Sequence, residues 1–237
     1  MVAVHGHRGA QGVLPGNTLA GFRYAIEAGC DAIELDVLAT RDDVLVVCHD
    51  PVLKRRVIRE QTFEELRLPT LREALELAPC GEFQFDIEVK SFPRRPRYSP
   101  PPQRLAELLF EELERLRLGL RVLVLSFDFR VLRAMRQLAP AIRLAALYQF
   151  GARDFVSIAR DAGAETVAPY HRLVTERKVA AAHRAGIQVV PWTANRPGDW
   201  KRLVRAGVDG IITDHPAALI EYLRSFTPSG RPPEGAG

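Results

Sequence analysis

The spacing of three carboxylate residues, Glu34, Asp36 and Glu88, predicts that their side chains point into the same region. Glu34 and Asp36 lie two residues apart in an apolar run, and Glu88 precedes Lys90 by the same spacing. Side chains two apart on a strand share a face, so each pair projects from one side of its strand. Buried carboxylates repel one another. The pattern therefore predicts either a hard cation such as Mg²⁺ or Ca²⁺, or a buried ion-pair network with Arg8 or Lys90.

Two histidines follow predicted strands, and each could move a proton. His7 ends the first apolar run, and His49 ends a run that follows the second. Histidine titrates near neutral pH, so a pair of histidines can supply a general acid and a general base. Each histidine alone fits a hydrogen-bonded structural role equally well, and both interpretations stay open. We expect His5 to serve packing or to support His7.

The elements that must position these residues alternate regularly along the chain. Short β-branched runs predict strands at residues 2–5, 32–37, 83–89, 121–125, 142–148, 166–169, 187–193 and 210–213. Amphipathic segments between them predict helices at residues 18–28, 70–77, 102–118, 128–138, 152–162, 175–185, 197–206 and 216–226. We expect helix caps at Thr18, Thr70, Asp128 and Thr175, with glycines such as Gly119 and Gly163 just past helix ends.

Eight strands alternating with eight helices predict a single (β/α)₈ barrel, in which chemistry lies at the C-terminal ends of the strands. The alternative is a doubly wound sheet, which would need G-x-G-x-x-G after its first strand. The chain has Gly6-His-Arg-Gly9-Ala10 there, so the barrel is favoured. Residues 1–226 form the predicted domain, with an extra strand at 44–48, a short insertion at about 51–68, an irregular loop at 91–103 and a disordered Pro/Gly-rich tail at 227–237.

Composition excludes several classes of protein. The 33 lysines and arginines exceed the 29 aspartates and glutamates to give a net charge of +4. No basic stripe is interleaved with aromatic residues, so we expect no nucleic-acid partner. We find no apolar run of transmembrane length, no secretory signal pattern and no C-x-x-C pair among three cysteines. The chain is therefore predicted to be cytoplasmic without stable membrane insertion, and the sequence specifies no oligomeric state.

Taken in order, the motifs resemble those of the glycerophosphodiester phosphodiesterase family over residues 4 to about 220. The matching segments are His7-Arg8-Gly9, Pro15-Gly16-Asn17-Thr18, Ile33-Glu34-Leu35-Asp36-Val37, His49-Asp50-Pro51, Glu88-Val89-Lys90, Ser126-Phe127, Trp192-Thr193-Ala194-Asn195 and the segment from Gly207 to Pro216. The resemblance implies a (β/α)₈ barrel. It also implies an enzyme that hydrolyses glycerophosphodiesters to glycerol 3-phosphate and an alcohol.

The resemblance also implies roles for individual residues. His7 and His49 would be general acid and base, in an order that the sequence does not fix. One divalent cation, Mg²⁺ or Ca²⁺ with Mn²⁺ as a further candidate, would be held by Glu34, Asp36 and Glu88. The phosphate oxygens would be bound by Arg8 and Lys90, and the pocket for glycerol or the departing alcohol would be lined by Trp192. Asp214 and Thr213 are expected to be structural.

Two departures from the family pattern motivate alternatives. Gly16 replaces a glutamate, and we expect it to form a turn with positive φ while another residue or water replaces the carboxylate. The insertion after His49-Asp50 is short. A non-catalytic phosphodiester-binding homologue is one alternative. An amidohydrolase-type metal hydrolase is another, suggested by His5-x-His7, but its further histidine at the fifth strand is missing.

Overall fold

The barrel predicted from the sequence is present in the computed structural model of the chain, which describes residues 2–77, 83–118 and 121–225. Hydrogen bonding orders its strands β10, β9, β8, β7, β6, β2, β1 and β11, all parallel. Their bounds are β1 Ala3–Gly6, β2 Ala32–Ala39, β6 Gln84–Val89, β7 Val122–Ser126, β8 Arg143–Tyr148, β9 Thr166–Pro169, β10 Gln188–Val189 and β11 Gly210–Thr213.

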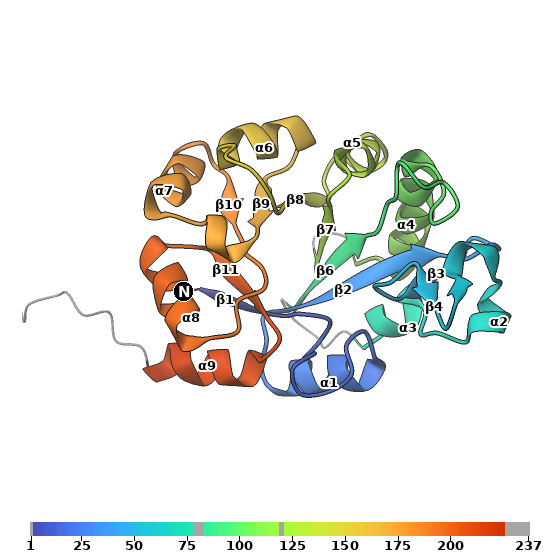
Figure 1. Cartoon of the computed structure of the whole chain (residues 1–237), viewed down its shortest axis with the longest axis horizontal. Coiled ribbons are helices and arrows are strands. Elements are labelled where there is room, and N and C mark those ends of the chain that lie inside the picture. Colours follow the sequence, from blue (N-terminus) through green and yellow to red (C-terminus); the bar gives the residue numbers. More distant parts are fainter. Residues whose placement is uncertain (1, 78–82, 119–120, 226–237) are drawn as a thin grey trace, which may run out of the picture.

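The two ends of this strand order meet, which distinguishes the barrel from an open sheet. The amide of Asp209 donates to the carbonyl of Val189 at 3.0 Å, and that of Ile212 donates to Pro191 at 3.0 Å. These bonds join the β10 segment to the β11 segment (Figure 1). The doubly wound alternative is therefore wrong, and the C-terminal ends of all the strands open onto one face of the molecule.

Helices follow the barrel strands and surround them (Figure 1). Their bounds are α1 Leu19–Glu27, α3 Leu71–Leu75, α4 Pro102–Leu116, α5 Phe129–Leu138, α6 Phe155–Ala162, α7 Glu176–Arg184, α8 Pro197–Ala206 and α9 Pro216–Ser225. Each lies within the segment predicted for it, because the apolar stripe of each segment packs on the barrel. Residue 226 of the last predicted helix and the tail 227–237 lie outside the described residues.

The predicted helix starts coincide with side-chain caps. Four side-chain oxygens accept a backbone N–H from the first turn of their helices, those of Thr18, Thr70, Asp128 and Thr175. Such a cap contributes about 1 kcal/mol to stability. Gly163 ends α6 with φ of 67°, a left-handed conformation in which glycine carries no Cβ penalty. Gly119 lies outside the described residues.

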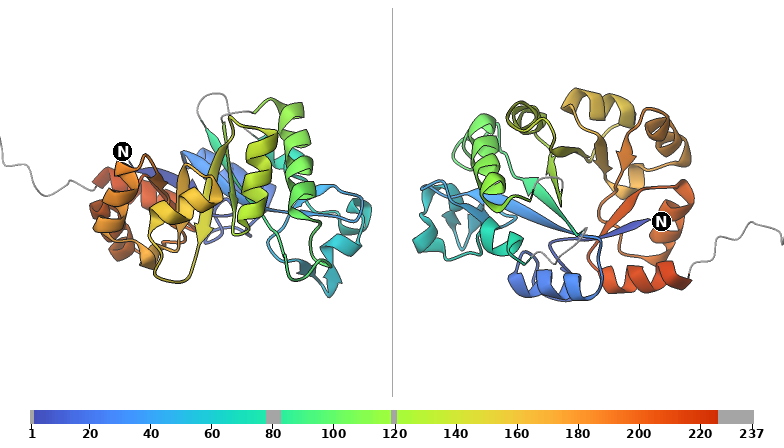
Figure 2. Two further views of the ribbon diagram at one scale, coloured as in Figure 1. Left: turned by 90° about the horizontal axis from the view of Figure 1, so that it is seen from above. Right: turned by 180° about the vertical axis from the view of Figure 1, so that it is seen from behind.

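The insertion contains more regular structure than the sequence predicts. Strand β3, Leu45–Val47, pairs antiparallel with β2, as expected for the segment 44–48. After it come a hairpin of β4 (Val52–Leu53) and β5 (Arg56–Val57), a 3₁₀ turn (Ile58–Glu60) and helix α2 (Phe63–Leu66). The loop after β6 is irregular up to Pro101, as predicted. Figure 2 shows the insertion and this loop extending together from one edge of the barrel.

The interior of the barrel is polar on one side and apolar on the other. Leu123, Leu125, Leu147 and further residues of β7 to β11 form a compact apolar cluster. The buried ionisable side chains of the barrel strands come instead from β1, β2 and β6, namely His5, Glu34, Asp36 and Asp86. This asymmetry places charged groups beside an apolar wall.

None of the helices within the described ranges is long and apolar enough to cross a membrane.

Candidate active site

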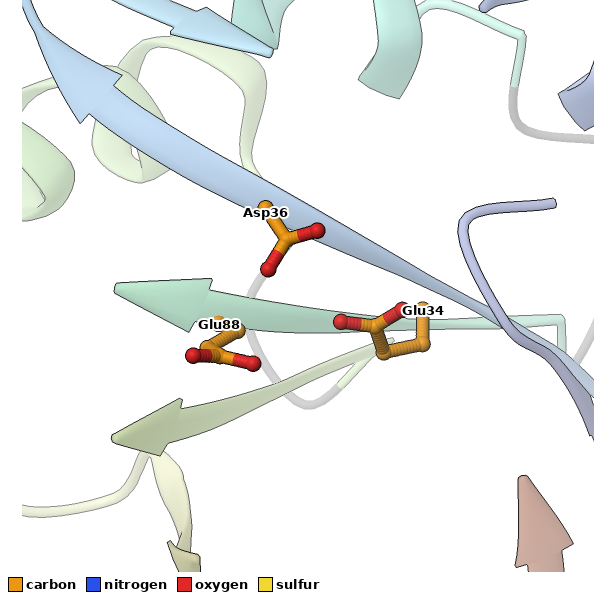
Figure 3. Close-up of side chains that lie close together, drawn as sticks. All are labelled: Glu34, Asp36 and Glu88. Atoms are coloured by element: carbon orange, nitrogen blue, oxygen red, sulfur yellow. The ribbon is translucent and has the colours of Figure 1, made fainter. Parts of the chain in front are cut away.

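The three predicted carboxylates meet inside the barrel (Figure 3). Glu34 and Asp36 lie on β2, and the strand register pairs Asp36 with Glu88 on the neighbouring strand β6. One oxygen of each carboxylate lies within 4.8 Å of the other two. Glu34 and Asp36 are buried, and Glu88 is partly buried. We call these three residues the acidic cluster.

Two cations contact the acidic cluster. The Nζ atom of Lys90 lies 2.7 Å from Oε1 of Glu88 and 3.3 Å from Oδ1 of Asp36. The Nε atom of Arg8 lies 3.0 Å from Oδ2 of Asp36. The backbone amide of Arg8 also donates to Oε2 of Glu34 at 2.9 Å. The ion-pair network considered from the sequence is thus present, with two cations facing three carboxylates.

Asn17 is a site residue to which the sequence analysis assigned no role. Its Nδ2 donates to Oδ2 of Asp36 at 2.9 Å, and its Oδ1 accepts the amide of Asp36 at 3.2 Å. Asn17 has φ of 58°, a left-handed conformation that asparagine tolerates. The positive φ expected at Gly16 is therefore wrong, because the turn places it one residue later.

Burial and mutual repulsion perturb the three carboxyl groups in different directions. Burial raises the pKa of Glu34 well above its usual range, and the charges of Asp36 and Glu88 add to this. Burial also raises the pKa of Glu88 to about 7, although Lys90 opposes the shift. Burial opposes ionisation of Asp36 too, but Lys90, Arg8 and the Asn17 bond outweigh it and lower that pKa. The pKa of two of the three carboxyl groups is therefore raised in spite of the two cations.

His7 is held by a chain of polar side chains from the last two strand ends. Its Nδ1 lies 2.5 Å from Oδ1 of Asp214, and Nδ2 of Asn195 donates to the other oxygen of Asp214 at 2.5 Å. The Oδ1 of Asn195 in turn accepts the amide of Asp214 at 2.9 Å. A carboxylate on Nδ1 leaves Nε2 as the proton-accepting atom. That atom faces the acidic cluster, 3.9 Å from Oε2 of Glu34.

Asp214 is thus more than the structural residue expected from the sequence. Strands β1 and β11 pair in parallel with Gly6 opposite Thr213. The next residue along each strand, His7 and Asp214, must therefore be neighbours once the barrel closes. A predicted closed barrel pairs its first strand with its last, and this pairing could have identified the contact between His7 and Asp214.

His49 lines the same pocket and is more exposed than His7. Its Nδ1 lies 2.7 Å from Oδ1 of Asp50. Burial lowers the pKa of His49, and the positive charge of Lys90 lowers it further. A lowered pKa keeps this imidazole neutral at physiological pH, in the form that accepts a proton.

Every predicted site residue except Asp36 lines one pocket of about 420 Å³. His7, Arg8, Glu34, His49, Glu88, Lys90 and Trp192 line it, together with Leu125, Phe127, Leu147, Gln149, Thr193 and Ile212. The Trp192 indole donates to the carbonyl of Ala168 at 2.8 Å and packs edge-on against the Phe127 ring at 5.6 Å between centroids. The pocket therefore has a charged wall opposite an apolar wall.

The space at Gly16 is taken by the side chain of Gln11. A Cβ at Gly16 would meet Oε1 of Gln11 at 2.8 Å and Cβ of Arg8 at 3.2 Å. The same Oε1 accepts a hydrogen bond from Nη1 of Arg8 at 2.9 Å. A neutral amide thus contacts Arg8 beside the position where the family pattern has a carboxylate.

The acidic cluster fits a hard divalent cation. Oδ1 of Asp36 is buried and forms no hydrogen bond to any described residue, and its one described ion-pair contact is Nζ of Lys90 at 3.3 Å. Burial and the neighbouring carboxylates raise the pKa of Glu34 and of Glu88, although Arg8 and Lys90 oppose the shifts. Carboxylate oxygens from three side chains, without thiolates or imidazoles among them, are the donors that Mg²⁺ and Ca²⁺ prefer. These residues could therefore hold one such ion.

Comparison with known proteins agrees with this geometry. The profile of the glycerophosphoryl diester phosphodiesterase family matches residues 7–218. A glycerophosphodiester phosphodiesterase of Caldanaerobacter subterraneus is 32% identical, over 92% of this chain and 96% of the relative. One from Bacillus altitudinis is also 32% identical, over 93% of this chain and 98% of the relative.

Solved structures show the same relationship. A structure from Silicibacter pomeroyi, provisionally assigned as a glycerophosphoryl diester phosphodiesterase, has a TM-score of 0.88 and 29% identity, covering 94% of this chain and 93% of its own. A glycerophosphodiester phosphodiesterase from Parabacteroides distasonis has a TM-score of 0.84 and 25% identity, covering 94% and 97%. The amidohydrolase alternative has no support, since β8 ends at Tyr148 without a histidine. The chain belongs to the glycerophosphoryl diester phosphodiesterase family.

Proposed function

We propose that this chain hydrolyses glycerophosphodiesters to glycerol 3-phosphate and an alcohol, with one divalent cation and two histidines. The observation that carries the proposal is a single pocket lined by His7, His49 and two members of the acidic cluster, Glu34 and Glu88. Its support is the family membership of the chain and the pairing of each histidine with a carboxylate.

Glu34, Asp36 and Glu88 would hold the cation, which is Mg²⁺, Ca²⁺ or Mn²⁺. When bound, it supplies positive charge to the phosphate oxygens as charge develops on them. Without it, Lys90 is engaged by Glu88 and Asp36. Once the cluster is neutralised, Lys90 and Arg8 are free to bind phosphate oxygens, Arg8 through its planar fork.

The histidines transfer the protons that the reaction requires. Nε2 of His7 faces the cluster, while Asp214 holds its Nδ1 and stabilises the ring when it is charged. His49 lines the same pocket and is neutral at physiological pH. One ring takes a proton from the attacking water as its oxygen bonds to phosphorus, and the other donates a proton to the alcohol oxygen as its bond to phosphorus breaks. The apolar wall of Trp192 and Phe127 contacts the carbon atoms of the glycerol or of the alcohol.

The proposal is tested by following glycerol 3-phosphate release from glycerophosphocholine and glycerophosphoglycerol. Activity should disappear with excess EDTA and return with Mg²⁺, Mn²⁺ or Ca²⁺. His7→Ala and His49→Ala should each lower the rate about 10²–10⁴-fold. His183→Ala is the matched control. This histidine is exposed on α7, pairs with Asp209 and does not line the pocket.

Full activity in EDTA, or near-normal rates in both pocket variants, would contradict the mechanism. Binding of glycerol 3-phosphate without turnover of any phosphodiester would instead support the non-catalytic alternative.

A further inference from the structure

Exposed apolar side chains are concentrated on the face that carries the pocket. Among the described residues, the exposed large apolar side chains are Val13, Val52, Phe127 and Phe150, at 50%, 39%, 46% and 77% exposure. All four lie in segments that follow the C-terminal end of a strand, after β1, β3, β7 and β8. Isolated exposed apolar residues are ordinary, but their restriction to one face of a barrel suggests a surface that is covered in use.

Unpaired cations lie on the same face. The turn of the β4–β5 hairpin carries Lys54 and Arg55 with Arg56 next to it, and the loop after β6 carries Arg94 and Arg95. We call these five exposed residues the basic rim. None of them lies within ion-pair distance of a described carboxylate. Arg59 of the insertion, by contrast, forms an ion pair with Asp43.

The two parts of the basic rim are fixed to one another. Arg97 of the loop forms an ion pair with Glu60 of the insertion at 2.6 Å. Phe92 of the loop packs on the small apolar cluster of the insertion that includes Ile58, and its amide donates to Oγ of Ser99 at 3.0 Å. Figure 2 shows the insertion and the loop extending side by side from the barrel. The guanidinium groups are therefore presented together by a folded platform.

We propose that this face docks the protein reversibly on an anionic lipid surface, with the basic rim against the headgroups and Phe150 inserted at the interface. Cations attract an anionic surface within about a Debye length, and an aromatic side chain gains from leaving water there. A nucleic acid would use the cations but would leave Phe150 and Val52 in water. The pocket opens on the same face, so docking brings it against phosphodiester lipids. Docking itself does not depend on the hydrolysis proposed above.

Sedimentation with vesicles of known composition tests the proposal on the full chain. Binding should be weak on phosphatidylcholine alone, strong when a third of the lipid is phosphatidylglycerol, and reduced by high salt. Each cation near such a surface contributes about a fivefold change in partitioning. Arg55→Glu/Arg94→Glu should therefore reduce binding by about 25-fold or more, and Phe150→Ser should reduce it further.

The matched control carries the same charge change on the opposite face. Arg117 and Arg184 are exposed cations near the C-terminal ends of α4 and α7, where the chain turns back into the barrel. Arg117→Glu/Arg184→Glu should bind vesicles nearly as well as the wild type. Turnover of soluble glycerophosphocholine should be unchanged in Phe150→Ser and in both charge variants, because none of these residues lines the pocket.

Equal binding to both vesicle types, an equal loss in the control variant, or binding to duplex DNA but not to vesicles would overturn the docking proposal. A chain that binds vesicles without hydrolysing any phosphodiester would leave docking in place and refute the proposed function. Hydrolysis of soluble substrate without vesicle binding would support the proposed function and refute docking.

Discussion

Cation binding at the acidic cluster should depend steeply on pH, because protons compete for the same oxygens. Burial raises the pKa of Glu88 to about 7 and that of Glu34 well above its usual range. Asp36 stays ionised, since Lys90 and Arg8 outweigh the effect of its burial and lower its pKa. In the cation-free protein, Glu88 is therefore mainly protonated below about pH 7, and a bound cation must displace that proton; the raised pKa of Glu34 adds to the competition.

The size of the effect follows from these shifts. A carboxyl group with a pKa of about 7 is about nine-tenths protonated at about pH 6. Glu88 alone should therefore weaken apparent cation affinity about tenfold between about pH 8 and about pH 6, which corresponds to about 1.4 kcal/mol. The pKa of Glu34 is also raised, so protons on Glu34 add to this loss. Affinity falls as the pH falls, because protonation removes the ligand.

Calorimetric titration of the chain with Mg²⁺, in pairs of buffers with different ionisation enthalpies, measures both affinity and proton release. At about pH 6.5 Glu88 alone should release most of one proton per cation bound. Glu88→Gln should bind more weakly and release about one proton fewer. Glu176→Gln, on the exposed first turn of α7, should change neither quantity. The reasoning is refuted if affinity is constant over this range and no protons are released.

Three substitutions test the side chains around the cluster. Asp214→Asn should lower the rate about 10²–10⁴-fold, because His7 loses the carboxylate that holds its tautomer and stabilises its charge; the acid limb of the pH–rate profile should move with it. Asn17→Ala should weaken Mg²⁺ affinity about 10–100-fold, since Asp36 loses two hydrogen bonds that orient it. Lys90→Met should raise the inhibition constant of glycerol 3-phosphate at least tenfold, because it removes a cation from the phosphate site.

Circular dichroism and thermal unfolding of each variant separate these effects from loss of the fold. An unchanged rate in the Asp214 variant would show that His7 needs no such partner. Wild-type Mg²⁺ affinity without Asn17 would show that the strands alone position Asp36. An unchanged inhibition constant of glycerol 3-phosphate in Lys90→Met would show that Lys90 does not bind the phosphate.

The sequence predicts the barrel well because each element carries its own local signal. The apolar runs of β2 and β6, the caps at Thr18 and Asp128, and the start of α8 at Pro197 are decided within a few residues. Alternation then fixes which side chains of β2 face inward, so Glu34 and Asp36 are grouped without knowledge of the rest of the chain.

Contacts between segments that are distant in the sequence carry no such local signal, so they are not predicted. His7 and Asp214 are separated by 207 positions, and only the pairing of β1 with β11 brings them together. The β4–β5 hairpin is missed for a different reason. Its turn residues Lys54 and Arg55 have φ of 49° and 66°. Tight hairpin turns with positive φ usually contain Asn-Gly or Gly, so this sequence gives no turn signal.

Gln11 explains how a departure from a family motif can leave a site intact. Judged by the motif alone, Gly16 removes a carboxylate from the neighbourhood of Arg8. In the folded chain, the amide oxygen of Gln11 contacts Arg8 at 2.9 Å and occupies the space beside Gly16. A carboxylate there would offset the charge of Arg8, whereas an amide positions the guanidinium and leaves its charge available to a phosphate. The substitution therefore changes the charge balance of the pocket more than its architecture.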